Sequence, residues 1–163
     1  MRAAFYKGTR PGIAGLYNRL GRYLDCGPYS HVEHVFSDRF GRVSGSSSFI
    51  DKGVRLKYIG YTSGDWDFLQ CPPEWEEASY RWFMEHRGAP YDLLAQIKFG
   101  IGFVQINEAN AWYCNESCIA SVDHLLSDAK PERYGPNGMY DLYRAAGCVP
   151  VATPWETDSW PNP

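Results

Sequence analysis

The sequence lacks a long apolar run and an excess of charge of either sign. No stretch approaches the roughly 18 to 20 apolar residues that cross a membrane as a helix, and the start MRAAFYKGTRPG has no signal-peptide core. We therefore expect a cytoplasmic protein without a transmembrane segment. The 16 Lys and Arg residues against 19 Asp and Glu residues leave a net charge of −3, which does not indicate a nucleic-acid partner.

The spacing of the cysteines and histidines indicates neither a disulfide framework nor a zinc site. The cysteines are odd in number and irregularly spaced, so we expect free thiols that pack as small apolar residues. No second closely spaced Cys/His pair accompanies Cys114 and Cys118, and we expect neither a metal nor a cofactor. The five cysteines are Cys26, Cys71, Cys114, Cys118 and Cys148.

What is present indicates a globular chain, because 44% of the residues are hydrophobic and 16% are aromatic. The length suits a single domain over 1–163, with an irregular Pro-rich tail from about residue 150. Strands come first and helices later, an order typical of the α+β class. The predicted strands are 3–7, 30–36, 43–50, 53–61 and 66–71. The predicted helices are 13–24, 74–88, 91–104, 114 to about 126, and 139–147, with loops at 106–111 and 131–138.

The stretch WYCNESC raises the question of what Cys114 does. Polar residues come first and the apolar IASVDHLL follows, so a helix is predicted to begin at Cys114. Free N–H groups and the dipole of a helix start favour a thiolate. On the residues alone, Cys114 is open to four roles: nucleophile, metal ligand, half of a disulfide, or core residue. Cys118, one turn later, is expected to face the core.

A cysteine nucleophile needs a base, and only some of the four histidines qualify. His124 follows ten residues later on the same helix, about 15 Å along the axis, and His86 ends another helix. His31 and His34 remain, on opposite faces of one strand. Glu33 shares the face of His31 and could orient its imidazole. On the residues alone, the polar face of a half-exposed sheet is the simpler interpretation of this pair.

Four segments in order add a resemblance: YSHVEHVFSD, SGSSSFIDKGVRLKYI, GAPYDLL and WYCNESC. Together they resemble the circularly permuted papain-like cysteine hydrolases, the YiiX-like branch of the NlpC-type amidases, and more distantly the lecithin:retinol acyltransferase group. In that branch the histidine strand precedes the cysteine helix, as His31 precedes Cys114 here. The likeness covers about residues 5 to 142. The compact form, with its FYKG start, is also similar to small proteins encoded in phages and prophages.

The resemblance implies a permuted papain-like fold, in which an antiparallel sheet or small barrel packs against helices that include the cysteine helix. It implies that Cys114 is the nucleophile and His31 the base. Glu33 matches the third polar residue by position, and the serines of 44–48 are a rival source. Glu116 matches an acidic residue of the motif and is expected to fix the helix rather than touch the reacting atom.

The sequence departs from the family at two positions. Asn115 replaces the commoner serine, and His34 occupies a position where an aliphatic residue is usual. Further candidates to line the site are Trp112, Tyr113, Tyr6 and Lys7. Trp66 and Trp112 are better explained by core and helix–sheet packing, although Trp112 is adjacent to the cysteine and could also wall a substrate groove.

The function that follows is hydrolysis of an amide or ester through an acyl-enzyme, without a cofactor. A small peptide, a peptidoglycan fragment or an acylated molecule would be the substrate. Two alternatives remain, an acyltransferase acting on lipid or N-acyl groups and a phage interaction or structural protein that keeps the fold without catalysis. A shielded Cys114 would favour the interaction protein. The oligomeric state is not predicted.

Overall fold

A six-stranded antiparallel sheet is the centre of the computed structural model, which describes residues 1–92, 111–126 and 130–154. The strand order is β4-β3-β2-β1-β5-β6, and every neighbouring pair is antiparallel. Together with the helices this confirms the α+β class. The strands are β1 (Arg2–Tyr6), β2 (His31–Val35), β3 (Ser44–Ser48), β4 (Gly53–Lys57), β5 (Trp66–Gln70) and β6 (Val149–Val151).

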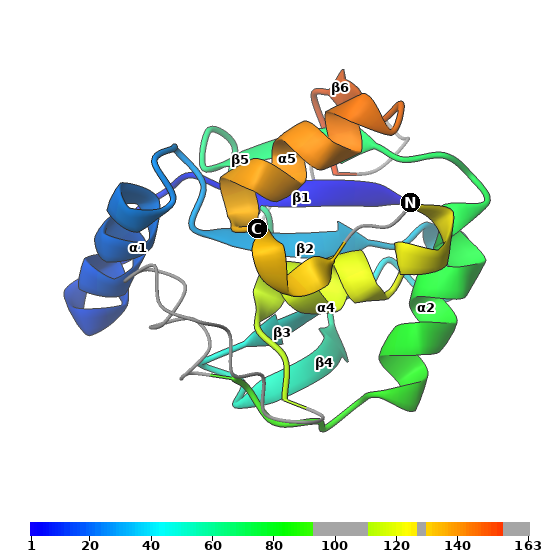
Figure 1. Ribbon diagram of the computed structural model, residues 1–163, viewed down its shortest axis with the longest axis horizontal. Coiled ribbons are helices and arrows are strands. Elements are labelled where there is room, and N and C mark those ends of the chain that lie inside the picture. Colours follow the sequence, from blue (N-terminus) through cyan, green and yellow to red (C-terminus); the bar gives the residue numbers. More distant parts are fainter. Residues whose placement is uncertain (93–110, 127–129, 155–163) are drawn as a thin grey trace.

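Three of the described helices, α2, α4 and α5, cover one face of the sheet, and α1 lies apart from them at one side (Figure 1). The larger apolar core lies beneath these three helices. The α-helices are α1 (Gly12–Leu24), α2 (Trp75–Glu85), α4 (Cys114–Ala120) and α5 (Pro136–Ala145). Short 3-10 helices are η1 (Asp38–Phe40), η2 (Asp123–Leu125) and η3 (Pro131–Arg133).

The alternation of β2 divides its residues between the two faces of the sheet. Val32 and His34 point into the core under the helices, where His34 contacts α2 and α5. Glu33 and Val35 point to the other face. A second, smaller core covers that face, and Tyr61, from the loop after β4, lies in it with its hydroxyl 2.7 Å from that of Ser44. The expectation of a half-exposed polar face was wrong, because this face is also covered.

The helix that starts at Cys114 is shorter than predicted. It ends at Ala120 rather than near residue 126, and a separate 3-10 turn, η2, follows. The hydroxyl of Ser121 donates to the carbonyl of Cys118 at 2.8 Å. Such bonds from serine back to the preceding turn weaken a helix interior, and they agree with an end at this point.

The last helix begins earlier than predicted, at Pro136 inside the expected loop. Proline suits the first helical position because its missing N–H has no helical partner there. The carboxylate of Asp25 accepts from the backbone N–H of Asn137 at 2.8 Å and from its side-chain amide at 2.6 Å. This contact joins residues 112 apart in the sequence, so no local pattern announces it.

Only the first residues of the predicted irregular tail form a strand, β6, which pairs with β5, and residues 155–163 of that tail fall outside the described residues. Pro150 is compatible with β6 because the strand lies at the edge of the sheet. The predicted helix at 91–104 falls outside the described residues from 93 onward, as does most of the predicted loop at 106–111. No helix in the described ranges is long and apolar enough to cross a membrane.

Gly45 allows β3 to pack closely against α2. A Cβ on Gly45 would lie 2.7 Å from Cδ2 of Phe83, which is fully buried, whereas a Cβ on Gly60 would meet nothing within 4 Å. We expect Gly45→Ala to lower the free energy of unfolding by about 1 to 3 kcal/mol through overpacking. Gly60→Ala is the matched control and should change it little. Urea denaturation measures both, and equal values would contradict the close contact.

Candidate active site

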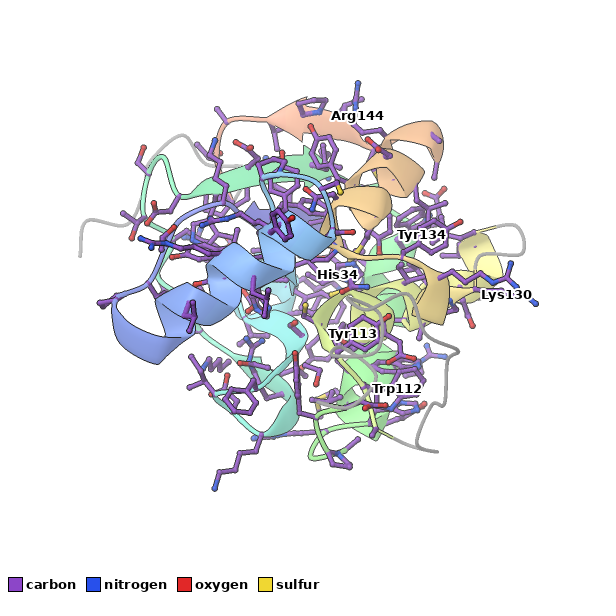
Figure 2. All side chains as sticks on the ribbon, turned by 60° about the vertical axis from the view of Figure 1, so that its left-hand side comes forward. His34, Trp112, Tyr113, Lys130, Tyr134 and Arg144 are labelled. Atoms are coloured by element: carbon purple, nitrogen blue, oxygen red, sulfur yellow. The ribbon has the colours of Figure 1, made fainter. Side chains whose placement is uncertain are left out.

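The start of α4 places Cys114 on the first helical turn. Tyr113 before it is extended, and its backbone N–H donates to Oε2 of Glu116 at 3.4 Å, so Glu116 caps the helix, as expected from its position. Figure 2 shows Tyr113 and Trp112 on the segment that leads into this helix. The N–H groups of a first turn have no helical acceptor. Cys114 therefore lies beside backbone donors, and it is only 1% exposed.

His31 stands between Glu33 and Cys114. It is the first residue of β2, and its Nε2 lies 2.7 Å from Oε1 of Glu33. Burial lowers the pKa of His31, but the charge of a Cys114 thiolate, a hydrogen bond to it, and Glu33 together raise that pKa to about 9. Because Glu33 occupies Nε2, Nδ1 is the ring nitrogen left for the sulfur. The arrangement favours an imidazolium at neutral pH.

Glu33 is held in turn by Arg55, a residue that the sequence analysis did not single out. The Glu33 side chain is 2% exposed, and both carboxylate oxygens accept from the Arg55 guanidinium, one of them at 2.6 Å. Burial raises the pKa of Glu33, but the guanidinium and His31 lower it to about 2. Glu33 is therefore ionised and fixed in position beside the imidazole.

The ion pair extends outward from Arg55 along one edge of the sheet. Nε of Arg55 donates to Asp51 at 3.0 Å, and Nζ of Lys57 contacts the same carboxylate at 2.6 Å. Charges of alternating sign thus run from Lys57 through Asp51, Arg55 and Glu33 to His31. The bidentate pair of Arg55 with Glu33 restricts the Glu33 carboxylate more than a single hydrogen bond would.

The serines of 44–48, the rival source of a third catalytic residue, have other partners. Ser46 donates to the carbonyl of Val32 at 2.7 Å, and Ser47 donates to that of Trp112 at 2.6 Å. These bonds tie β3 to β2 and to the segment before α4. Among the residues considered for the third position, Glu33 is the one in contact with His31.

His34 does not take part in this arrangement. Its Nδ1 lies 2.7 Å from the hydroxyl of Ser79, and its Nε2 lies 2.8 Å from that of Tyr143. Burial is the main cause that lowers the pKa of His34 to about 3, so it stays neutral. Of the two histidines on β2, His31 is the one that the structure brings to Cys114.

Tyr6 is one of the residues expected to line the site. It is paired with His31 on the neighbouring strand, β1. Its ring packs on Trp66, with centroids 4.9 Å apart, and Trp66 lies edge-on to His31 at 6.4 Å. Trp66 was predicted only as a core residue, because nothing local shows which strand lies beside β1. Lys7 bonds Asp67 at 2.6 Å.

The contacts of Trp112 agree with the packing interpretation rather than with a groove wall. Its ring packs edge-on against Trp82 of α2 at 5.0 Å and against His86 at 5.8 Å. The indole thus belongs to the contact between α2 and the segment before α4. Asn115 lies beside the sulfur, because its Oδ1 is 3.6 Å from Sγ of Cys114, and its side-chain amide donates to the carbonyl of Tyr134.

The other cysteines have different surroundings. Cys118 is fully buried in the core, as expected, and Cys26 is exposed. All five are free thiols. The ranges that the structure describes contain no group of three or more His, Cys, Asp and Glu residues that could hold a metal ion.

Comparison with known proteins adds no family. No family model matches the chain, and no curated protein matches it significantly in sequence. Arguments about function therefore depend on the geometry of Cys114, His31, Glu33 and Arg55.

The two histidines of β2 should titrate very differently. We expect NMR to show His31 titrating with a pKa of about 9, because Cys114 and Glu33 stabilise its charged form. His34 should show no titration from about pH 5 to 10. Cys114→Ala and Glu33→Gln should each lower the pKa of His31. A His31 pKa near 6.5 that is indifferent to Cys114→Ala would contradict the contact.

Arg55 should be essential to stability because it compensates a buried charge. We expect Arg55→Met to lower the free energy of unfolding by about 3 to 5 kcal/mol, since Glu33 then keeps a buried charge without its main partner. Adding Glu33→Gln should recover part of this loss. Arg39→Met removes an exposed pair with Glu77 and should change stability by less than about 1 kcal/mol. Denaturation of the wild type, both single variants of the pair, their double variant and Arg39→Met at pH 7 tests this, and additive effects of the two substitutions would disprove the coupling.

Proposed function

We propose that the chain is a cysteine hydrolase of the amidase or peptidase type, with Cys114 as nucleophile and His31 as base. The observation that carries the proposal is the position of His31, bonded to Glu33 through Nε2 and to Cys114 at the start of a helix. Cysteine hydrolysis needs this combination of nucleophile, base and orienting group.

The reaction proceeds in two steps. The Cys114 thiolate attacks the carbonyl carbon of an amide or ester, and backbone N–H groups of the first turn of α4 stabilise the oxyanion. The His31 imidazolium gives its proton to the leaving group as the carbon–nitrogen or carbon–oxygen bond breaks, which leaves a thioester on Cys114. Neutral His31 then takes a proton from water, the hydroxide attacks the thioester, and an acid and the thiolate are released. Glu33 orients the ring in both steps.

The permuted papain-like fold is part of the same proposal. A histidine on a strand of an antiparallel sheet precedes a cysteine at the start of a helix packed on that sheet. This order and packing support the resemblance, and peptides, peptidoglycan fragments or acylated molecules are the substrates that it implies.

The alternative, an interaction protein that keeps the fold without catalysis, is favoured by one observation. Cys114 is 1% exposed, so a substrate must displace part of its surroundings to reach the sulfur. The His31 side chain is 17% exposed and offers a route to the pair from the side of the imidazole. Reactivity of the thiol therefore distinguishes the two functions.

Alkylation by iodoacetamide, followed by mass spectrometry across a pH series, is the test. We expect Cys114 to be labelled faster than the exposed Cys26 near pH 6, because thiolates rather than thiols react. His31→Ala should slow labelling of Cys114 by about tenfold or more and leave Cys26 unchanged. His124→Ala, which removes an exposed histidine, is the matched control. Labelling of Cys114 that is slower than that of Cys26 and indifferent to His31 would favour the interaction protein.

A further inference from the structure

Helix α1 presents an apolar stripe to solvent. Leu16, Leu20 and Tyr23 lie at i, i+4 and i+7 and therefore share one face, and their exposed fractions are 69%, 53% and 80%. Asn18 and Gly15 lie away from this face and are buried. Helices normally place apolar side chains in the core, so the outward position of these three is unusual. We call these three residues the α1 stripe.

The segment that carries the stripe is basic, whereas the rest of the chain is acidic. Residues 7–24 contain four basic side chains and no Asp or Glu. The remaining residues carry 12 basic against 19 acidic side chains, a net charge of −7. The four basic residues are Lys7, Arg10, Arg19 and Arg22.

Three of these charges are not neutralised by a carboxylate within the described part of the chain. Arg22 donates to the carbonyls of Lys7 and Gly8 at 2.6 and 2.7 Å, which are uncharged acceptors. Arg10 lies over the ring of Tyr6, 5.6 Å from its centroid. Arg19 is exposed and flanks the stripe, three residues after Leu16.

We propose that the α1 stripe docks on the surface of an anionic lipid bilayer. A basic helix with an outward apolar face lies flat in such an interface, and its affinity comes from apolar burial plus attraction to anionic headgroups. Tyr23 suits the interface because its ring is apolar and its hydroxyl is polar. Three side chains are too few for a stable protein interface, which buries roughly 1,200 to 2,000 Å².

The position of α1 connects this surface to the candidate active site. Figure 1 shows α1 at the side of the sheet where β1 ends and β2 begins, away from α2. The side-chain amide of Asn18 donates to the hydroxyl of Ser30 at 3.0 Å, and Ser30 immediately precedes His31. Docking through α1 would bring the His31 end of the sheet close to the lipid. The docking itself does not depend on the chemistry of Cys114.

Flotation with lipid vesicles tests the proposal. The protein should float with vesicles of phosphatidylcholine and phosphatidylglycerol, and much less with phosphatidylcholine alone or at high salt. Leu16→Ser/Leu20→Ser should weaken binding by at least about tenfold, because two exposed leucines no longer enter the apolar layer. Ile50→Ser/Met84→Ser changes two exposed apolar residues outside α1 and should bind as the wild type does.

Further variants separate the possible explanations. Arg19→Glu should reduce binding to anionic vesicles only, and Cys114→Ser should bind normally even where catalysis is lost. Circular dichroism must show that every variant stays folded. Absence of wild-type binding, or equal binding by Leu16→Ser/Leu20→Ser, would overturn the proposal. So would light scattering that shows a wild-type dimer and a monomeric double variant without vesicle binding, because the stripe would then join two copies of the chain.

Discussion

The buried pair between Glu33 and Arg55 is the interaction on which the candidate site depends. A carboxylate that is 2% exposed is unfavourable by itself, because the surroundings cannot replace its hydration. Two hydrogen bonds from the guanidinium compensate this loss and hold both oxygens in a plane. A carboxylate that remains ionised and fixed adds to the effect of Cys114 in stabilising a charged His31, so the state of the imidazole depends in part on a contact on its far side from Cys114.

The two histidines of β2 show how the faces of one sheet produce opposite chemistry. His31 and His34 are three residues apart, and the alternation of the strand sends them in different directions. His34 enters a neutral network with Ser79 and Tyr143, where burial without an adjacent carboxylate partner keeps it uncharged. His31 meets a carboxylate and a thiol. The difference in pKa, about 3 against about 9, therefore comes from partners rather than from burial alone.

The parts of the site that the sequence predicts are those that local patterns encode. Period-two alternation places His31 and Glu33 together, and the change from polar to apolar residues marks the helix start at Cys114. Arg55 could not be found in this way. Its contact with Glu33 requires that β3 lie between β2 and β4, with Ser46 opposite Arg55. A register between strands is set by tertiary packing, and one sequence does not display it.

The same limit explains the errors in the fold. The early start of α5 depends on Asp25, more than one hundred residues away, and β6 exists because β5 offers an edge to pair with. Leu16 and Leu20 show the converse case, since their helical spacing correctly predicts α1 but not the exposure of these two side chains.

The chain is acidic apart from the basic segment 7–24, whose helix α1 exposes the α1 stripe. An anionic surface attracts this basic segment and repels the acidic remainder, so the protein has a preferred orientation near such a surface. The Asn18–Ser30 bond fixes α1 to the residue before His31. Orientation by α1 therefore also sets which end of the sheet faces the surface, and that end carries the Cys114–His31 pair.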